Sequence, residues 1–436
     1  MFDKSIHIYF DKMHDNRGMG NGLSPHFSGM DHKANSNVNF YSSIYSDLRN
    51  TTIPYSILPT NEITQYTEHK YNTYFFEPKN LKLFKDSNVF EHISDIAKKY
   101  IRNNKLRLVI YYPFEAFPVN QGLFKSEFLC PILRSAKQEH FPVDNITIFY
   151  GDLNVIENYK KTVKFLEEDG FERIFPLPYW EFHQQRYMKN NLAYAVPVEN
   201  RVSKLDRPYK FLCFNGAARP HRFIAVSELE RRNIIDQGLV SMIGRYGTHN
   251  LTEQPIRWPY AYFNSKDPLQ VSMLDHLKTY LTAWKPRTLD RTFDEINTSD
   301  RLFDNQLYLK TFFSVVTETE MTNDVFFITE KSFHPMVNMH PFLMMGSCGT
   351  LAYLKKHGYE TFPEFFDESY DSEPDQVKRI MMVLDELEKV CNHYSLNYLR
   401  KLYYRAWPKL VHNRNNFLTR KHIHEFERMF EIIFEK

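Results

Sequence analysis

Short strand-like runs alternate with helical segments along most of this chain, and that alternation restricts the folds open to it. A helical pattern separates several of these runs, as at residues 221–238, where Gly238 is expected to close the helix. Strands and helices that alternate in this way form a parallel sheet with helices on both faces. The sequence therefore predicts an α/β fold. The strand-like runs are IHIYF (6–10), LRLVIYY (106–112), NITIFYGD (145–152), ERIFPLPYW (172–180), YKFLCFNG (209–216), LVSMIG (239–244), KTFFSVVTET (310–319) and HPFLMMGS (340–347).

The chain of 436 residues is too long for one ordinary hydrophobic core, so two domains are expected. The mixed, polar stretch 186–208 reads as the linker between them. We therefore predict a Rossmann-like domain at 1–190, a second at 207–375, and C-terminal helices at 376–436 that pack back on the domains. Two Rossmann-like domains that face a cleft, followed by a helical segment, form the GT-B architecture. Ligands of such sheets bind at the carboxyl ends of the strands.

Cysteine usage and hydropathy indicate a soluble protein from a reducing compartment. The four cysteines are scattered and form no C-x-x-C pair, which argues against a zinc site or a disulfide framework. The first residues, MFDKSIHIYFDKMHDN, lack the apolar stretch of a signal peptide. No uncharged apolar run approaches the roughly 18 residues that a membrane span needs. We expect a cytoplasmic protein without a membrane span, and the sequence indicates no oligomeric state.

A first candidate site follows the strand-like run that ends at Asn215-Gly216. Pro220 stands where the first turn of a helix is expected, a position that proline favours. Free backbone N–H groups at a helix start attract anions, and the guanidinium groups of Arg219 and Arg222 can hold phosphate oxygens in pairs. This corner therefore predicts a phosphate site. The alternative is a set of basic residues on an exposed turn.

A second candidate site is the triplet Thr329-Glu330-Lys331. Thr329 is predicted to cap a helix that starts at Glu330, while Pro335 is expected to bend or delay that helix. A carboxylate at this point can accept both hydroxyls of a ribose, and Lys331 can neutralise a pyrophosphate. The alternative is a capped helix start with a solvated lysine.

Taken together, these stretches resemble the donor half of the α1,3-fucosyltransferases. As in that family, a strand (KFLCFNG), an arginine-bearing helix, a short strand ending in glycine, a glutamate-bearing strand and a T-E-K helix follow one another. The R-P-H-R corner (219–222), ITEKSFHP (328–335), GTLAYL (349–354) and DESYD (367–371) are also similar to motifs of uncharacterised viral and bacterial glycosyltransferases. The resemblance covers about residues 207–372. It implies a GT-B glycosyltransferase with a nucleotide-sugar site, and it does not indicate the acceptor.

The resemblance also implies roles for individual residues. Thr329 and Glu330 belong to the donor site, with Glu330 on the ribose. Lys331 and Arg222 meet the pyrophosphate, and Glu318 lies near the sugar. Arg219 is the alternative to Arg222, because either can occupy the arginine position of the family. The donor is expected to be a UDP- or GDP-sugar, bound as a substrate.

A catalytic base is predicted in the N-terminal half. Glu115 lies just beyond the strand-like run LRLVIYY, where a carboxylate could deprotonate an acceptor hydroxyl as the sugar leaves the nucleotide. The fucosyltransferases have a glutamate at a similar strand end, so the resemblance supports this role. Asp11 and Asp152 are competing candidates, and the alternative for Glu115 is an ordinary exposed loop acid. If the mechanism follows the fucosyltransferases, the resemblance implies a reaction that inverts the anomeric centre, and the sequence itself does not distinguish inversion from retention.

Neither a metal nor a cofactor is expected. No Asp-x-Asp motif ends a strand-like run, and DESYD follows a helical pattern. Arginine, lysine and helix N–H groups are expected to stabilise the leaving diphosphate instead.

The acceptor is predicted from charge. Residues 393–421 hold seven Lys and Arg and no Asp or Glu, with aromatic residues between them. This composition suits phosphates and stacked bases, so Arg400, Lys401, Arg405 and Trp407 are candidate acceptor contacts. We predict a hydroxymethylated base in phage DNA as the acceptor. The alternatives are a cell-surface glycan or lipopolysaccharide, a protein that binds nucleotide or nucleic acid without catalysis, and, for the stretch itself, a helix pair with core aromatics and solvated charges.

Overall fold

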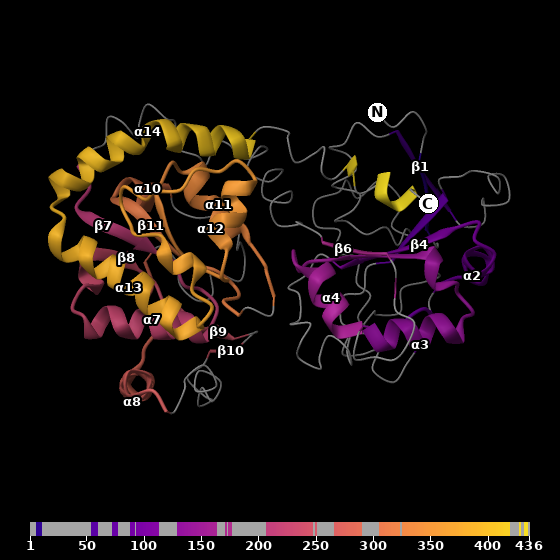
Figure 1. Cartoon of the computed structure of the whole chain (residues 1–436), viewed down its shortest axis with the longest axis horizontal. Helices are drawn as coiled ribbons and strands as arrows, with labels where there is room; N and C mark the ends of the chain where they lie inside the picture. The colour runs from indigo at the N-terminus through magenta and orange to yellow at the C-terminus, as the bar shows by residue number, and fades with distance from the viewer. Residues whose placement is uncertain are drawn as a thin grey trace. The chain divides into compact units, whose positions relative to one another are not determined.

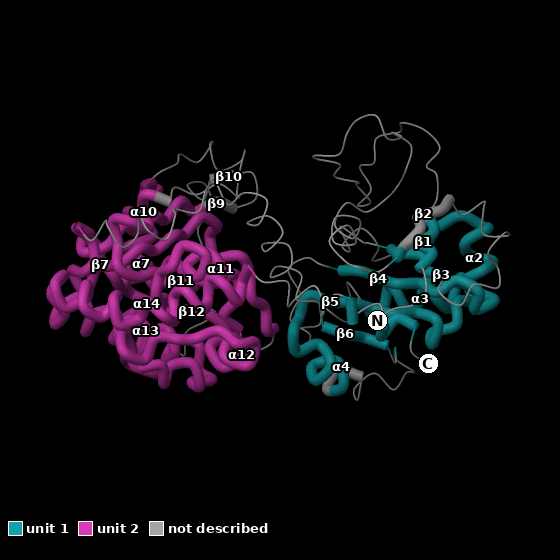
Figure 2. The backbone as a smooth tube through the Cα atoms, turned by 90° about the horizontal axis from the view of Figure 1, so that it is seen from above, with its two compact units in different colours: residues 1–183, 420–436 teal, residues 184–419 magenta. Residues whose placement is uncertain are grey.

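The computed structural model divides the chain into two compact units, shown by colour in Figure 2. Unit 1 comprises residues 1–183 and 420–436, and unit 2 comprises residues 184–419. The structure describes residues 6–10, 54–59, 72–76, 88–91, 93–112, 129–163, 171, 173–176, 206–246, 249–250, 266–289, 305–322, 325–418, 427–428 and 431–434.

Unit 1 is built on a six-stranded sheet in the order β2-β1-β3-β4-β5-β6, and all its neighbouring strands are parallel (Figure 1). Strands β4 and β5 are buried along almost their whole length, with Leu108 opposite Ile146, as expected for central strands covered on both faces. The strands are β1 (Ile6–Phe10), β2 (Tyr55–Pro59), β3 (Asn72–Phe76), β4 (Arg107–Tyr112), β5 (Ile146–Tyr150) and β6 (Ile174–Pro176). The helices are α2 (Asp95–Arg102), α3 (Cys130–Gln138), α4 (Val155–Val163) and the 3-10 turn η4 (Val143–Asn145).

Unit 2 contains a four-stranded parallel sheet in the order β12-β11-β7-β8. Its strands are β7 (Tyr209–Cys213), β8 (Gly238–Val240), β11 (Thr311–Thr317) and β12 (Phe342–Met345), and a separate antiparallel pair is β9 (Arg245–Tyr246) with β10 (His249–Asn250). Its helices are α7 (Pro220–Arg231), α8 (Pro268–Ala283), α10 (Asn305–Leu309), α11 (Glu330–Val337), α12 (Thr350–Lys356), α13 (Gln376–His393) and α14 (Leu396–Leu418), with 3-10 turns η6 (Ile235–Gln237) and η9 (Ser369–Ser372).

The two parallel sheets with flanking helices confirm the predicted α/β class and the paired Rossmann-like organisation of a GT-B protein. The helical C-terminal segment is also confirmed, as α13 and α14. Strands β2 and β3 were not predicted from the sequence. In the part of the chain that the structure describes, no helix is both long and apolar enough to cross a membrane.

The predicted role of Gly238 as a helix end is wrong. Helix α7 ends at Arg231, and Asn233 takes the left-handed conformation (φ 55°) that closes it. Gly238 instead begins β8 in an extended conformation. A Cβ atom at this position would lie 2.5 Å from the Phe211 ring on β7. The glycine therefore allows the close approach of two strands.

The amino ends of the unit 2 strands are held by a buried arginine. Arg207 precedes β7 and donates hydrogen bonds to the carbonyl groups of Tyr308 (2.8 Å) and Thr311, next to β11. Its guanidinium lies 4.5 Å from the ring centre of Tyr403 on α14, and the Tyr403 hydroxyl donates to the carbonyl of Met339 ahead of β12. The first half of α14 is therefore anchored at the amino edge of the sheet.

Candidate functional site

The strand order of unit 2 places a topological switch point between β7 and β11. From β7 the chain continues to β8 on one side, whereas β11 lies on the other side of β7. In open parallel sheets, ligands bind beyond the carboxyl ends of the strands at such a point. Both candidate sites predicted from the sequence lie there, because the first follows β7 and the second follows β11. Because the resemblance of its motifs implies a donor site, we call this region the donor corner; it comprises residues 214–222, 317–320 and 329–332.

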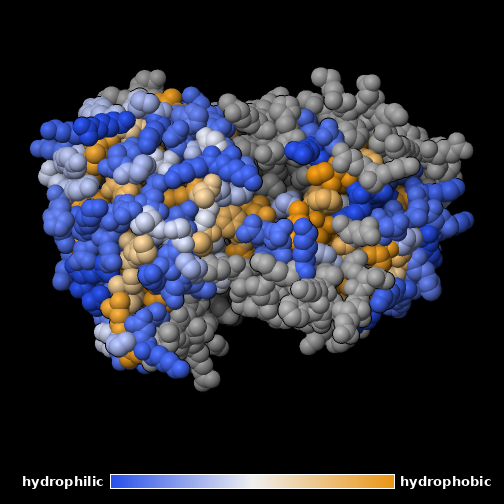
Figure 3. Space-filling model, viewed as in Figure 1, coloured by the Kyte–Doolittle hydropathy of each residue, from blue (hydrophilic) through white to orange (hydrophobic). Residues whose placement is uncertain are grey.

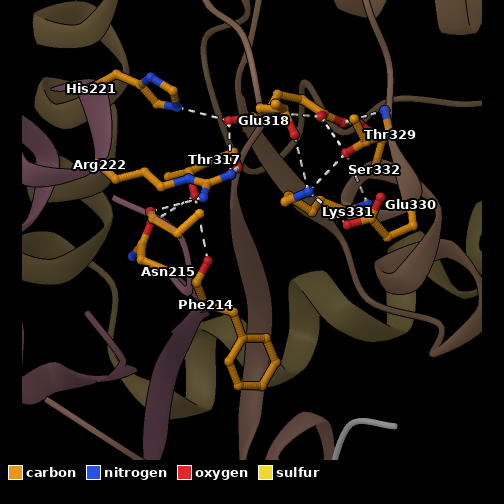
Figure 4. A network of polar contacts seen from close by, with 12 residues as sticks. Phe214, Asn215, His221, Arg222, Thr317, Glu318, Thr329, Glu330, Lys331 and Ser332 are labelled. Atoms are coloured by element: carbon orange, nitrogen blue, oxygen red, sulfur yellow. Dashed lines mark hydrogen bonds and ion pairs between the residues drawn. The ribbon is translucent and has the colours of Figure 1, made fainter. Parts of the chain in front are cut away.

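Asn215 connects the strand ends at the donor corner. It was not predicted as a site residue. It is fully buried, and its backbone N–H donates to the Ser241 hydroxyl at 3.0 Å. Its side-chain amide donates to the Ser241 carbonyl at 3.0 Å and accepts from the Thr317 hydroxyl at 2.7 Å (Figure 4). One side chain thus joins the carboxyl ends of β7, β8 and β11. A polar residue directly after a buried strand was the available sequence signal.

Arg222 is buried in the same corner. Its side chain is 1% exposed and donates to the carbonyl groups of Ala217 (3.1 Å), Thr317 (3.2 Å) and Glu318 (3.1 Å). The neighbouring ring of His221 also lies 2.7 Å from the Glu318 carbonyl (Figure 4). These contacts tie the first turn of α7 to the end of β11.

Arg219 has different surroundings from Arg222. It is the residue before the first turn of α7, which starts at Pro220 as predicted. Its side chain is 30% exposed, and one guanidinium nitrogen lies 3.3 Å from a carboxylate oxygen of Glu320. Of the two arginines, Arg219 therefore presents its charge at the surface of the corner.

The carboxylate of Glu318 points into the first turn of α11 (Figure 4). It is fully buried and accepts hydrogen bonds from the backbone N–H groups of Thr319 and Thr329, both at 3.1 Å. It also accepts from the hydroxyl groups of Thr329 (2.6 Å) and Ser332. Both carboxylate oxygens are thus engaged within the protein, in a position that holds α11 against β11.

Thr329 caps α11 at Glu330, as predicted, by accepting from the Lys331 N–H. Pro335 lies inside the helix and does not delay its start. The Lys331 ammonium donates to the hydroxyl groups of Thr319 and Thr329, both at 3.2 Å, and to Glu330 at 2.6 Å. The side chains of Lys331 and Glu330 remain 30% and 22% exposed. The pair therefore forms a partly open edge of the donor corner.

Titration at the corner follows from burial and charge. Burial raises the pKa of Glu330, but the charge and hydrogen bond of Lys331, with the protonated form of His334, outweigh it and lower the pKa to about 2. Burial lowers the pKa of His334 to about 4, against the opposing effect of Glu330. Burial, with the charge of Arg222, lowers the pKa of His221 well below its usual value. At neutral pH the carboxylate is ionised and both imidazoles are neutral.

The DESYD motif (367–371) serves the structure of unit 2. Asp371 accepts hydrogen bonds from the backbone N–H groups of Leu351 (2.8 Å) and Ala352 (3.0 Å), which start α12. The Tyr370 hydroxyl accepts from the backbone N–H of Met344 on β12 at 3.2 Å. The motif therefore attaches the start of α12 to the neighbouring strand.

Of the three candidate bases, Glu115 and Asp11 lie outside the described residues. Asp152 is fully buried, and its carboxylate accepts from the Asn154 N–H (2.9 Å) and the Asn158 side chain (2.8 Å). It thus caps the turn into α4. Among the described residues, no three His, Cys, Asp or Glu side chains gather as a metal-binding group.

The four predicted acceptor contacts lie on the first half of α14. Lys401 and Arg405 are exposed, and Arg400 and Trp407 are partly exposed. The face of unit 2 seen in Figure 3 is mainly hydrophilic. Because this part of α14 is anchored at the amino edge of the sheet, these side chains are remote from the donor corner at its carboxyl edge.

The chain was compared with known families, proteins and solved structures. No family model matches the chain, and no curated protein matches its sequence. Among solved structures, T4 phage BGT in complex with UDP and Mn²⁺ is similar over 99% of this chain and 100% of that one, with 12% identity and a TM-score of 0.40. A UDP-forming α,α-trehalose-phosphate synthase from Burkholderia xenovorans covers 86% of this chain and 77% of its own, with 10% identity and a TM-score of 0.41. An α1,3-fucosyltransferase covers 92% of this chain and 80% of its own, with 11% identity and a TM-score of 0.37.

The similar solved structures thus include an α1,3-fucosyltransferase, and the motifs of this chain resemble the donor half of that family. At these identities and TM-scores the comparisons carry no conclusion about chemistry. The function has to be inferred from the residues of the donor corner.

Proposed function

We propose that this chain is a nucleotide-sugar-dependent glycosyltransferase and that the donor corner of unit 2 binds its donor. The observation that carries the proposal is the chemistry gathered at the switch point. An ionised carboxylate and two partly exposed cations, Glu330, Lys331 and Arg219, border the carboxyl ends of β7 and β11. Lys331 and Arg219 contact the adjacent residues Thr319 and Glu320, so both cations border the same turn.

A nucleoside diphosphate matches these groups. Its ribose offers two hydroxyls to an ionised carboxylate, and its diphosphate needs cationic partners. Lys331 and Glu330 bond to each other at 2.6 Å. Binding would exchange this contact for Glu330 with the ribose and Lys331 with the diphosphate. Arg219 is the better candidate than Arg222 for a second phosphate contact, because Arg222 is buried and engaged with three carbonyl groups.

In the proposed reaction, an acceptor hydroxyl attacks the anomeric carbon of the sugar from the face opposite the nucleotide. The new carbon–oxygen bond forms as the bond to the diphosphate breaks, and the configuration inverts. The hydroxyl proton passes to a carboxylate, for which Glu115 remains the proposed base. Lys331 and Arg219 balance the charge that develops on the leaving diphosphate.

We propose DNA that carries a hydroxymethylated base as the acceptor. The acid-free segment 393–421, with its exposed Lys401 and Arg405, supports a polyanionic partner. The target base would be extruded from the duplex to bring its hydroxyl to the sugar. A cell-surface glycan is the competing acceptor.

The deciding experiment is a thermal-shift and calorimetric panel of UDP, GDP, dTDP and CDP. One nucleotide should raise the melting temperature of the wild type, and Lys331→Ala should weaken its binding about tenfold or more, since a charge-assisted contact is lost. Lys278→Ala, an exposed lysine on α8 paired with Asp275, is the control and should bind as the wild type does. The panel is repeated with EDTA and with Mn²⁺, and equal affinities would support metal-independent binding. If no nucleotide binds at millimolar concentration, the proposed function fails.

A further inference from the structure

Gly216 follows β7 in the donor corner, and the protein itself gives no reason for a glycine there. Six glycines of unit 2 are described, and five have a structural reason, either a neighbour that would crowd a side chain or a positive φ angle. Those five are Gly238, Gly244, Gly346, Gly349 and Gly358.

Neither reason applies to Gly216. Its φ angle lies outside the left-handed region, so a positive φ does not require the glycine. A Cβ atom built on it has no heavy atom of the described residues within 4 Å. The residue is partly exposed at the surface of the corner. A side chain at this position would therefore enter open space within the described part of the chain.

A need for flexibility does not explain the glycine either. On one side, the Ile243 N–H donates to the Asn215 carbonyl at 3.0 Å, and on the other side Arg222 donates to the Ala217 carbonyl at 3.1 Å. The backbone is thus clamped at both neighbours. A glycine that serves neither a positive φ angle, packing nor movement is best explained by a ligand that approaches the main chain.

We propose that Gly216 is the point at which the diphosphate of the donor passes against the main chain, a role that rests on the proposed function. In other parallel α/β sheets, a glycine after a strand lets the backbone approach a pyrophosphate. Here the partly exposed Arg219 follows three residues later and supplies a positive charge. A methyl group on residue 216 would occupy the volume of a phosphate oxygen.

The test compares Gly216→Ala and Gly216→Val with the wild type, using whichever nucleoside diphosphate binds the wild type. Both variants should keep the wild-type melting temperature, or exceed it by about 1–3 °C, because a side chain in open space restricts the unfolded chain without crowding the fold. Affinity for the diphosphate should fall stepwise, about tenfold for alanine and further for valine. The corresponding nucleoside, which lacks phosphates, should bind all three proteins equally.

Gly238→Ala is the matched control, because its Cβ would lie 2.5 Å from the Phe211 ring, away from the corner. It should lower the melting temperature while the folded protein keeps its affinity, the reverse of the Gly216 pattern.

Unchanged diphosphate affinity in Gly216→Val would overturn the proposal. A melting temperature lowered by several degrees would also overturn it, since protein would then fill the space. An equal loss of affinity for the nucleoside and for the nucleoside diphosphate would overturn the assignment of Gly216 to the diphosphate. If the wild type binds no nucleotide, the proposed function fails first and this role fails with it.

Discussion

Arg219 and Arg222 stand three residues apart, yet their side chains have opposite surroundings. Arg222 is buried with its guanidinium on three carbonyl groups, whereas Arg219 is 30% exposed beside Glu320. We expect Arg222→Ala to destabilise the protein by about 3 kcal/mol or more, because it leaves buried carbonyl groups without donors. Arg219→Ala should change stability by only about 0.5 kcal/mol and weaken nucleotide binding about tenfold. Urea unfolding and calorimetric titration measure the two effects.

Arg219→Lys is the control for charge. Lysine keeps the positive charge but cannot hold two phosphate oxygens at once, so this variant should recover only part of the nucleotide affinity that Arg219→Ala loses. The opposite result would reverse the assignment: nucleotide binding that is normal in Arg219→Ala and lost in a well-folded Arg222→Ala would place the diphosphate on Arg222.

At the residue scale, the sequence allowed some predictions and not others for a physical reason. The cap by Thr329 depends on a hydroxyl and an N–H two residues away, so a local pattern was sufficient to predict it. The direction of the Glu318 carboxylate depends on Ser332 and Thr329, which tertiary packing brings close. Likewise, nothing local distinguishes Arg219 from Arg222, because burial is decided by how α7 packs on the sheet.

At the element scale, the start of α11 depends on one buried carboxylate. One oxygen of Glu318 accepts from the Thr329 N–H and the other from the Thr319 N–H. In Glu318→Gln an NH₂ group would face one of these N–H groups, and a backbone donor cannot rotate away as a hydroxyl can. We expect a loss of about 1–3 kcal/mol in the free energy of unfolding, the cost of an unsatisfied buried donor.

The control for this prediction is Glu364→Gln, in a partly exposed pair with Lys409 on α14. It removes the same charge from unit 2 and should cost no more than about 1 kcal/mol, as for other surface ion pairs. Equal stabilities for the two variants in denaturant titrations would show that the carboxylate is not needed to hold α11.

The predicted strands are correct where the pattern of apolar residues and the length of the run both indicate a strand. The runs that became β4, β5, β7 and β11 are mainly apolar, as buried parallel strands are. The predicted end of α7 is wrong because a glycine after a helical pattern indicates a helix cap, whereas Gly238 is required by its packing contact with Phe211. A crowding contact between residues far apart in the sequence leaves no local pattern.

At the scale of the whole molecule, the donor corner and the basic residues of α14 occupy opposite edges of the unit 2 sheet. The corner follows the carboxyl ends of β7 and β11, whereas Tyr403 of α14 packs on Arg207 at the amino ends. With 23 residues, α14 is about 34 Å long. DNA bound along α14 would therefore contact the helix at a distance from the base that receives the sugar. The helix would add affinity for DNA of any sequence and would not recognise a particular base.

This arrangement predicts how DNA binding should depend on salt. Removing two phosphate contacts with Lys401→Ala/Arg405→Ala should lower DNA affinity and reduce the slope of log K against log salt by about 2. Nucleotide affinity should be unchanged, because the donor corner is remote. Fluorescence anisotropy with a hydroxymethylated duplex measures the slope, and Lys378→Ala/Lys389→Ala on α13 removes the same net charge from exposed positions as the control. A control that lowers the slope equally would attribute the effect to net charge alone. If the wild type binds nucleotide but not DNA, the acceptor is not DNA and the glycan becomes the acceptor to test.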